Sequence, residues 1–178
     1  MFFAYDVVTV KRPQQGRSYL LFAAACLLNT AAAAVLLASQ IPGFAWDAIA
    51  IIFCVLAAIS CALMIWALFF ALPKDTYADP QQGRSVCDWG MYALCRHPGV
   101  LWYCVMFLCL GIAFRTASAT IASTALCAGN IAYMVFQDLW SFPRVFGNYD
   151  EYRKHVPFFL PTASSFSRAL ADVTGGAR

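Results

Sequence analysis

Charged residues are scarce in this sequence. Asp, Glu, Lys and Arg make up 12% of its 178 residues, whereas 62% are hydrophobic. A soluble domain carries about 25% charged residues, and a chain this poor in charge cannot cover itself with a hydrated surface. The composition therefore predicts a protein whose solvent is the lipid bilayer. The net charge of +3 gives no indication of a nucleic-acid partner.

Metal-binding patterns are also missing. The only two histidines, His97 and His155, lie far apart, and the eight cysteines contain no C-x-x-C pair. Zinc sites usually show such close ligand spacings. Most of the cysteines lie in apolar runs, where they act as small hydrophobic residues. We expect neither a metal site nor a disulfide framework.

Long apolar runs are what the sequence does have. A helix rises about 1.5 Å per residue, so about 20 apolar residues cross the hydrocarbon core of about 30 Å. Lipid offers no partner for backbone groups, so the runs should be helices. We predict one all-α, polytopic membrane domain, residues 1–178, with about four transmembrane helices. The expected spans are 18–39, 48–72, 99–114 and 117–136.

Short connections and polar residues refine this prediction. Only Arg115 and Thr116 separate the last two runs, so these should form an antiparallel helical hairpin. Asn29 and Asn130 lie inside runs, and we expect each amide to hydrogen-bond a neighbouring helix. After the fourth run, an amphipathic segment, 137–161, is predicted to close a site, and 162–178 to be a flexible tail.

Basic residues predict the orientation. With four spans, eleven of the twelve Lys and Arg residues fall on one side of the membrane, and Arg115 alone falls on the other. Basic residues concentrate in cytoplasmic loops. Both termini should therefore lie in the cytoplasm, in a bacterial inner membrane or an equivalent one.

Two polar segments stand apart from the apolar runs. One reads G-M-Y-A-L-C-R-H-P over 90–98 and enters the third run; the other begins at Asp138 and extends to Pro161 after the fourth run. The predicted hairpin brings both to the same cytoplasmic end. There, an arginine, a histidine, tyrosines and an acid would converge where water meets lipid, which suits one polar and one lipidic reactant.

These segments resemble a known family. The first segment, followed by a hairpin, an acid and F-G-N-Y-D-E-Y-R-K-H-V-P-F-F-L-P over 146–161, is similar to the isoprenylcysteine carboxyl methyltransferase and phospholipid methyltransferase superfamily. The resemblance covers 90–161. It implies methyl transfer from S-adenosylmethionine, bound on the cytoplasmic side, to a carboxylate or amine of a lipid or a lipidated small molecule.

The resemblance also implies roles for particular residues. Arg153 would orient a carboxylate acceptor, and Asp138 would balance the charge of an amine or of the sulfonium. The residues implied in cofactor binding are Tyr92, Arg96, His97, Pro98, Tyr149 and Tyr152.

The chain departs from the family pattern at four positions. Val100 replaces a tyrosine and Trp102 a glycine, while Asp138 and Leu139 stand where paired glutamates are usual. Three alternatives therefore stay open: a catalytically inactive membrane protein of the same fold, a membrane NADPH-dependent reductase, and a small transporter. The sequence does not indicate an oligomeric state.

Overall fold

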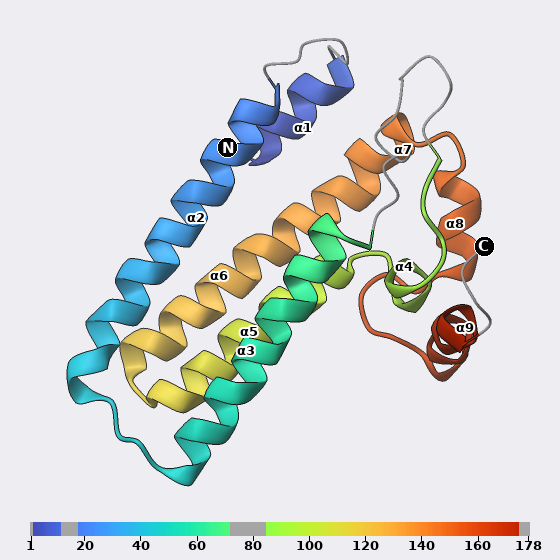
Figure 1. Cartoon of the computed structure of the whole chain (residues 1–178). Coiled ribbons are helices and arrows are strands. Elements are labelled where there is room, and N and C mark those ends of the chain that lie inside the picture. The colour runs from blue at the N-terminus through green and yellow to red at the C-terminus, as the bar shows by residue number, and fades with distance from the viewer. Residues whose placement is uncertain (1, 12–17, 72–84, 175–178) are drawn as a thin grey trace.

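The structure, a computed structural model, describes residues 2–11, 18–71 and 85–174. Within these ranges the chain forms helices and no strand, which confirms the all-α prediction (Figure 1). The longer helices are α1 (Phe2–Lys11), α2 (Ser18–Gln40), α3 (Ala48–Phe69), α5 (Pro98–Phe114), α6 (Ala117–Phe136) and α9 (Ala163–Thr174). The shorter elements are η1 (Ile41–Gly43), α4 (Met91–Leu94), η4 (Gln137–Ser141), α7 (Phe142–Val145) and α8 (Tyr149–His155).

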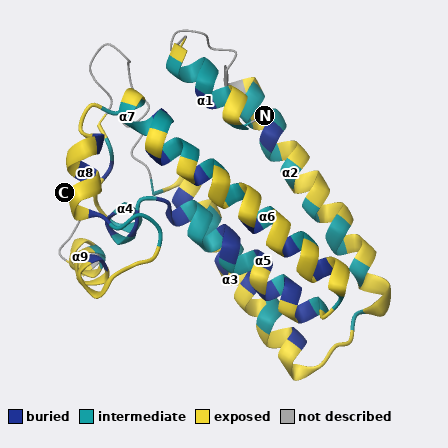
Figure 2. Cartoon of the chain, turned by 180° about the vertical axis from the view of Figure 1, so that it is seen from behind, coloured by how far each residue is buried: buried dark blue, intermediate teal, exposed yellow. Residues whose placement is uncertain are grey.

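Three of these helical stretches are long and apolar enough to cross a membrane: Leu20–Gly43, Ala48–Phe69 and Ala117–Val145. Large apolar residues of these helices are exposed, including Leu27 and Val35, each 71% exposed. Figure 2 shows exposed residues along the outer helices. Such extended apolar surfaces indicate contact with lipid, and the chain is a membrane protein. Helix α5 is apolar too, but has 17 residues. The predicted ranges match the helix bounds to within one residue, except that α3 ends at Phe69 rather than at residue 72; Leu72 itself lies outside the described residues.

The core forms around α5, against which both α3 and α6 pack (Figure 1). Tyr103 and Phe107 of α5 are buried there with Cys127 of α6. At the start of α5, a Cβ on Gly99 would come within 2.9 Å of the Leu68 side chain in α3. The absent side chain therefore allows α5 to lie close to α3.

At the end of the bundle away from α4, polar contacts join the loops. Asp47 accepts from the backbone N–H of Ala50 at 2.8 Å, which caps α3, and from Arg115 Nη2 at 2.6 Å. Thr116 caps α6 and donates to Gln40 Oε1 at 2.5 Å. These contacts link the ends of α2, α3 and α6 to the α5–α6 turn.

Helix α2 is also anchored by a hydrogen bond to α5 and by packing against α1. The Tyr103 hydroxyl donates to Asn29 Oδ1 at 3.3 Å, so the prediction for Asn29 is confirmed. Helix α1 was not predicted. Phe2 and Phe3 place their rings 5.3 and 5.2 Å from that of Tyr133 in α6, which fixes α1 beside the end of α6.

Helix α9 occupies Ala163–Thr174 of the segment 162–178 for which a flexible tail was expected, and residues 175–178 lie outside the described residues. The backbone N–H of Ser165 donates to Thr162 Oγ1 at 3.2 Å, and the N–H of Thr162 donates to Ser165 Oγ at 2.9 Å. This reciprocal pair is a capping box, which satisfies backbone donors at the start of a helix. The small, polar composition of 162–168 thus marks a helix start rather than a linker.

Candidate functional site

The candidate site begins with a distortion of the helix that follows α6. Between Gln137 and Ser141 the chain adopts a π-helical turn, η4. Pro143 explains this locally, because it has no N–H for the carbonyl of Leu139, and its ring would clash with that carbonyl in a regular α-helix. Single π-turns inside α-helices occur frequently at functional sites. Here the turn contains Asp138, which is 3% exposed.

Asp138 is the centre of a buried hydrogen-bond network. Arg96 Nη1 donates to Asp138 Oδ1 at 2.6 Å and to Oδ2 at 2.8 Å. The Tyr149 hydroxyl donates to Oδ1 at 2.5 Å, and His97 Nε2 lies 3.4 Å from the same oxygen. Burial and this contact with Asp138 raise the pKa of Tyr149 above its ordinary value, so the phenol keeps its proton. The two polar segments, one with Arg96 and His97 and the other with Tyr149, thus meet at one carboxylate.

His97 is held between aromatic rings. It is 5% exposed, stacks on Phe142 with centroids 5.5 Å apart, and meets the edge of Phe158 at 5.6 Å. Burial lowers the pKa of His97, although Asp138 opposes this shift. The imidazole is therefore neutral at pH 7. Because a carboxylate only accepts, the neutral ring donates from Nε2 to Asp138.

Arg96 has contacts of three kinds. Its guanidinium forms an ion pair with Asp138 and lies 5.1 Å from the centre of the Phe158 ring. The Arg96 side chain is 11% exposed. Its backbone N–H donates to the carbonyl of Pro157 at 3.0 Å, which joins the two polar segments through the main chain. Arg96 Nε is buried and has no hydrogen-bond partner among the described residues.

Tyr92 and Tyr152 lie beside this network and brace it. The Tyr152 hydroxyl donates to the Tyr92 carbonyl at 2.7 Å, and the Tyr92 hydroxyl donates to the Ala67 carbonyl of α3 at 2.9 Å. Tyr152 and Tyr149 share one buried face of α8 with Val156. Helix α8 is therefore tied through α4 to the end of α3.

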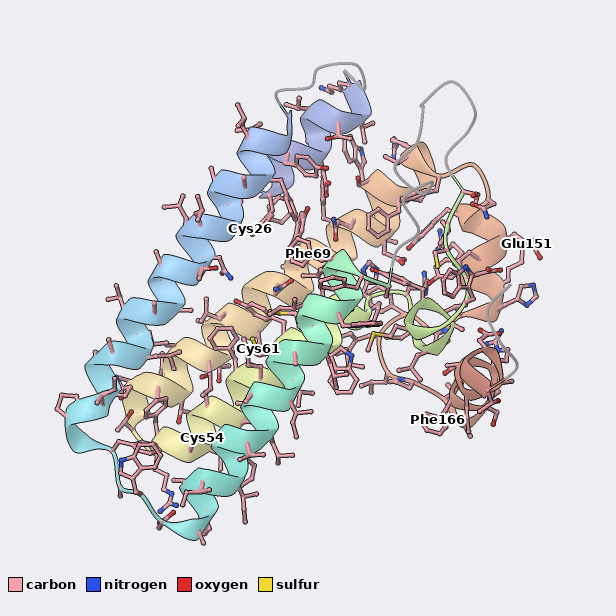
Figure 3. The ribbon with its side chains drawn as sticks, in the orientation of Figure 1. Cys26, Cys54, Cys61, Phe69, Glu151 and Phe166 are labelled. Atoms are coloured by element: carbon pink, nitrogen blue, oxygen red, sulfur yellow. The ribbon has the colours of Figure 1, made fainter. Side chains whose placement is uncertain are left out.

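The structure does not bring every candidate together. Pro98 is buried as the first residue of α5, directly behind His97. Arg153, however, is on the surface: its side chain is 39% exposed and lies 3.6 Å from Asp150. On the outer face of α8, Glu151 instead binds Lys154 and His155 (Figure 3). Arg153 therefore lies outside the Asp138 network, because its charge is paired locally along α8.

Phe142 and Phe158 were not identified from the sequence. Phe142 is next to Pro143, and Phe158 lies inside the P-F-F-L-P run, so only the tertiary structure shows that both rings face the histidine and arginine. The structure also shows the environment of Leu139, which stands where the family pattern has a glutamate. Leu139 is 63% exposed and faces away from Asp138.

Val100 and Trp102, the two residues of α5 that depart from the family pattern, have different environments. Val100 packs against the core cluster of Tyr103 and Phe107. Trp102 has its indole Nε1 buried without a hydrogen-bond partner among the described residues. Unsatisfied buried donors are uncommon in folded proteins, and here two occur on residues of one segment, Arg96 and Trp102.

No protein-family model, curated protein or solved structure matches this chain. The functional interpretation therefore depends on the motifs and on the geometry of the Asp138 network.

Proposed function

We propose that this chain is an integral-membrane methyltransferase that uses S-adenosylmethionine and acts on a carboxylate or amine of a lipid or lipidated small molecule. The observation that carries the proposal is the buried network in which Arg96, His97 and Tyr149 converge on Asp138. It joins the two segments that resemble the methyltransferase superfamily, and it lies next to apolar helices that suit a lipidic substrate.

The proposed topology has four spans, with α5 and α6 as a transmembrane hairpin and both termini in the cytoplasm. The near-absence of basic residues from the predicted outer loops supports it, since a four-span topology assigns eleven of the twelve Lys and Arg residues to the other side. A bacterial inner membrane or its equivalent is the location that we propose. In this arrangement the Asp138 network faces the cytoplasm, where the cofactor is available.

The chemistry of the free donors fits the proposed cofactor. Arg96 Nε and Trp102 Nε1 are buried and lack partners among the described residues, so each can donate to an acceptor such as the cofactor's carboxylate. Aromatic rings attract cations, and the ring of Phe158 already lies by the Arg96 guanidinium. When bound, S-adenosylmethionine would supply an electrophilic methyl group on a cationic sulfur.

In this proposal Asp138 acts as a positioning residue. Both of its oxygens accept from Arg96, and one also accepts from Tyr149, so it holds these side chains in place. Positioning and exclusion of water account for much of the rate increase in such transfers. Arg153, at the surface of α8, would act on an acceptor carboxylate only from the cytoplasmic side.

Calorimetric titration of the detergent-purified protein tests the proposal. S-adenosylmethionine should bind, and His97→Ala should weaken binding at least tenfold, because it removes the ring between Phe142 and Phe158. His155→Ala is the matched control, since His155 is exposed and its ring contacts the Glu151 carboxylate at the surface of α8; the affinity of this variant should equal that of the unchanged protein. A folded protein that binds no S-adenosylmethionine would refute the proposal.

One observation favours a non-catalytic membrane protein of the same fold as the second candidate. Both Asp138 oxygens accept hydrogen bonds from side chains of the chain itself, as in a purely structural network. The titration separates the candidates: absence of binding of both S-adenosylmethionine and NADPH supports the non-catalytic protein, whereas NADPH binding alone supports a reductase.

A further inference from the structure

We propose that α9 lies in the headgroup region of the bilayer that the apolar helices cross, with Phe166 and Leu170 inserted among the lipid chains. The lipid surface would then bind the C-terminal helix as well as surround the spanning helices. This inference depends on the membrane character of the chain and is independent of methyl transfer.

The face that α9 uses to dock on the protein is formed by small and polar residues. Ser165 is fully buried, and Ala169, one turn later, is partly buried on the same side. Asp172 accepts from the backbone N–H of Gly90 at 3.1 Å, which attaches the helix next to α4. Helix α9 packs on α4 through these residues.

The large apolar residues of α9 point elsewhere. Phe166 and Leu170 lie one turn apart and are 59% and 53% exposed. At about 100° per residue, they occupy a stripe about a quarter of a turn or more from Ser165. Figure 3 shows Phe166 at the lower edge of α9. A helix docked in water normally buries its apolar stripe, so this one requires another apolar environment.

Hydrogen bonds place α9 at the membrane border. It packs on α4, and α4 is bound to the last turns of α3 because the Tyr92 hydroxyl donates to the Ala67 carbonyl. The apolar surface of α3 ends at this level with Phe69 and Phe70, 64% and 66% exposed. The contact with α4 therefore places α9 at the end of the bundle where the apolar surface of α3 stops.

This position at the end of an apolar helix favours lipid as the occupant. Helices that lie in the membrane plane combine one apolar stripe with an opposite polar face. The side of α9 opposite Phe166 presents Ser164 and Ala171, both exposed, and Arg168 donates to the His155 carbonyl. Leu160, just before the helix and 68% exposed, adds a further apolar side chain. A protein partner or a second copy would instead be revealed by the experiment below.

Photocrosslinking in vesicles tests the inference. The full chain, with Phe166→p-benzoylphenylalanine or, as matched control, Ser164→p-benzoylphenylalanine, is reconstituted into phosphatidylcholine vesicles and irradiated. We expect at least fivefold more phospholipid adduct from position 166 than from position 164, measured by mass spectrometry. Equal yields, or adducts at 166 mainly to protein, would overturn the inference.

Hydrogen exchange gives an independent measurement. The double variant Phe166→Ser, Leu170→Ser leaves Ser165, Asp172 and the Thr162 cap in place, so the helix keeps its docking contacts. In vesicles, the amides of 163–174 should exchange at least fivefold faster in this variant than in the unchanged chain, whereas Ser164→Ala should leave the rate unchanged. Equal exchange in the double variant contradicts lipid insertion.

Discussion

At the scale of single residues, one buried carboxylate balances one buried guanidinium. Asp138 and Arg96 have side chains that are 5% and 11% exposed, so neither charge has much access to water. Removing one partner of a buried ion pair leaves an uncompensated charge, which is much more costly than losing a surface pair. Asp138 is therefore the residue on which the local structure of the site depends most.

The substitution Asp138→Asn should lower the free energy of unfolding by about 3–5 kcal/mol, because Arg96 stays buried without a counter-charge. Asp150→Asn is the matched control. The Asp150 side chain is 84% exposed and lies 3.6 Å from Arg153, so its loss should cost less than about 1 kcal/mol. Denaturant unfolding in detergent measures both, and similar losses would contradict the assignment of Asp138 as the centre of the network.

His97 should make stability depend on pH. Burial lowers the pKa of His97 in the folded protein below the ordinary value of 6.5. As the pH falls below about 6.5, His97 takes up a proton in the unfolded chain but not in the folded chain. The free energy of unfolding therefore decreases as the pH falls. Thermal unfolding from pH 8 to pH 5 should show a falling melting temperature. In His97→Gln the fall should be smaller; an equal fall would show that other groups cause it.

At the scale of elements, the chain enters helix α4 through a residue with an unusual backbone conformation. Gly90 has φ +61° and ψ −127° immediately before α4, and its N–H donates to Asp172. Residues other than glycine rarely adopt this backbone conformation, because their Cβ clashes with the main chain. The glycine thus connects the orientation of α4, which carries Tyr92, to the docking of α9.

Gly90→Ala should therefore destabilise the protein by about 1–3 kcal/mol through backbone strain, although a Cβ there would meet open space. Gly147→Ala is the control, since a Cβ at Gly147 also meets nothing within 4 Å and its φ is not in the strained region. The control should change the melting temperature little. Equal shifts for the two variants would mean that strain at Gly90 is not the cause.

At the scale of the whole molecule, the proposed four-span topology predicts where each end lies. A phosphatase that is active only outside the cytoplasm should be inactive when fused after Arg178. The same enzyme inserted after Gly43, between α2 and α3, should be active. Activity of the fusion after Arg178 would contradict the cytoplasmic C-terminus, and inactivity at Gly43 would contradict the first outer loop.

The sequence by itself determined the apolar helices and the polar end of the molecule. Length and hydropathy specify where helices α2, α3, α5 and α6 lie, because lipid leaves the backbone no alternative. The motif around Arg96 and His97 and the acid at Asp138 were also evident, since each is a local pattern. The tail expected over 162–178 contains helix α9, which the sequence did not indicate because a capping box and a linker have similar composition, and only the reciprocal Thr162–Ser165 bonds distinguish them.

Only the tertiary structure decided which of the polar residues meet. Arg153 and Tyr149 both lie on α8, yet Tyr149 reaches Asp138 and Arg153 pairs with Asp150 at the surface. The rings of Phe142 and Phe158 gain their role only when two distant segments pack around His97. Hydropathy records how each residue interacts with water or lipid, whereas a network of hydrogen bonds depends on distances between residues that are remote in the chain.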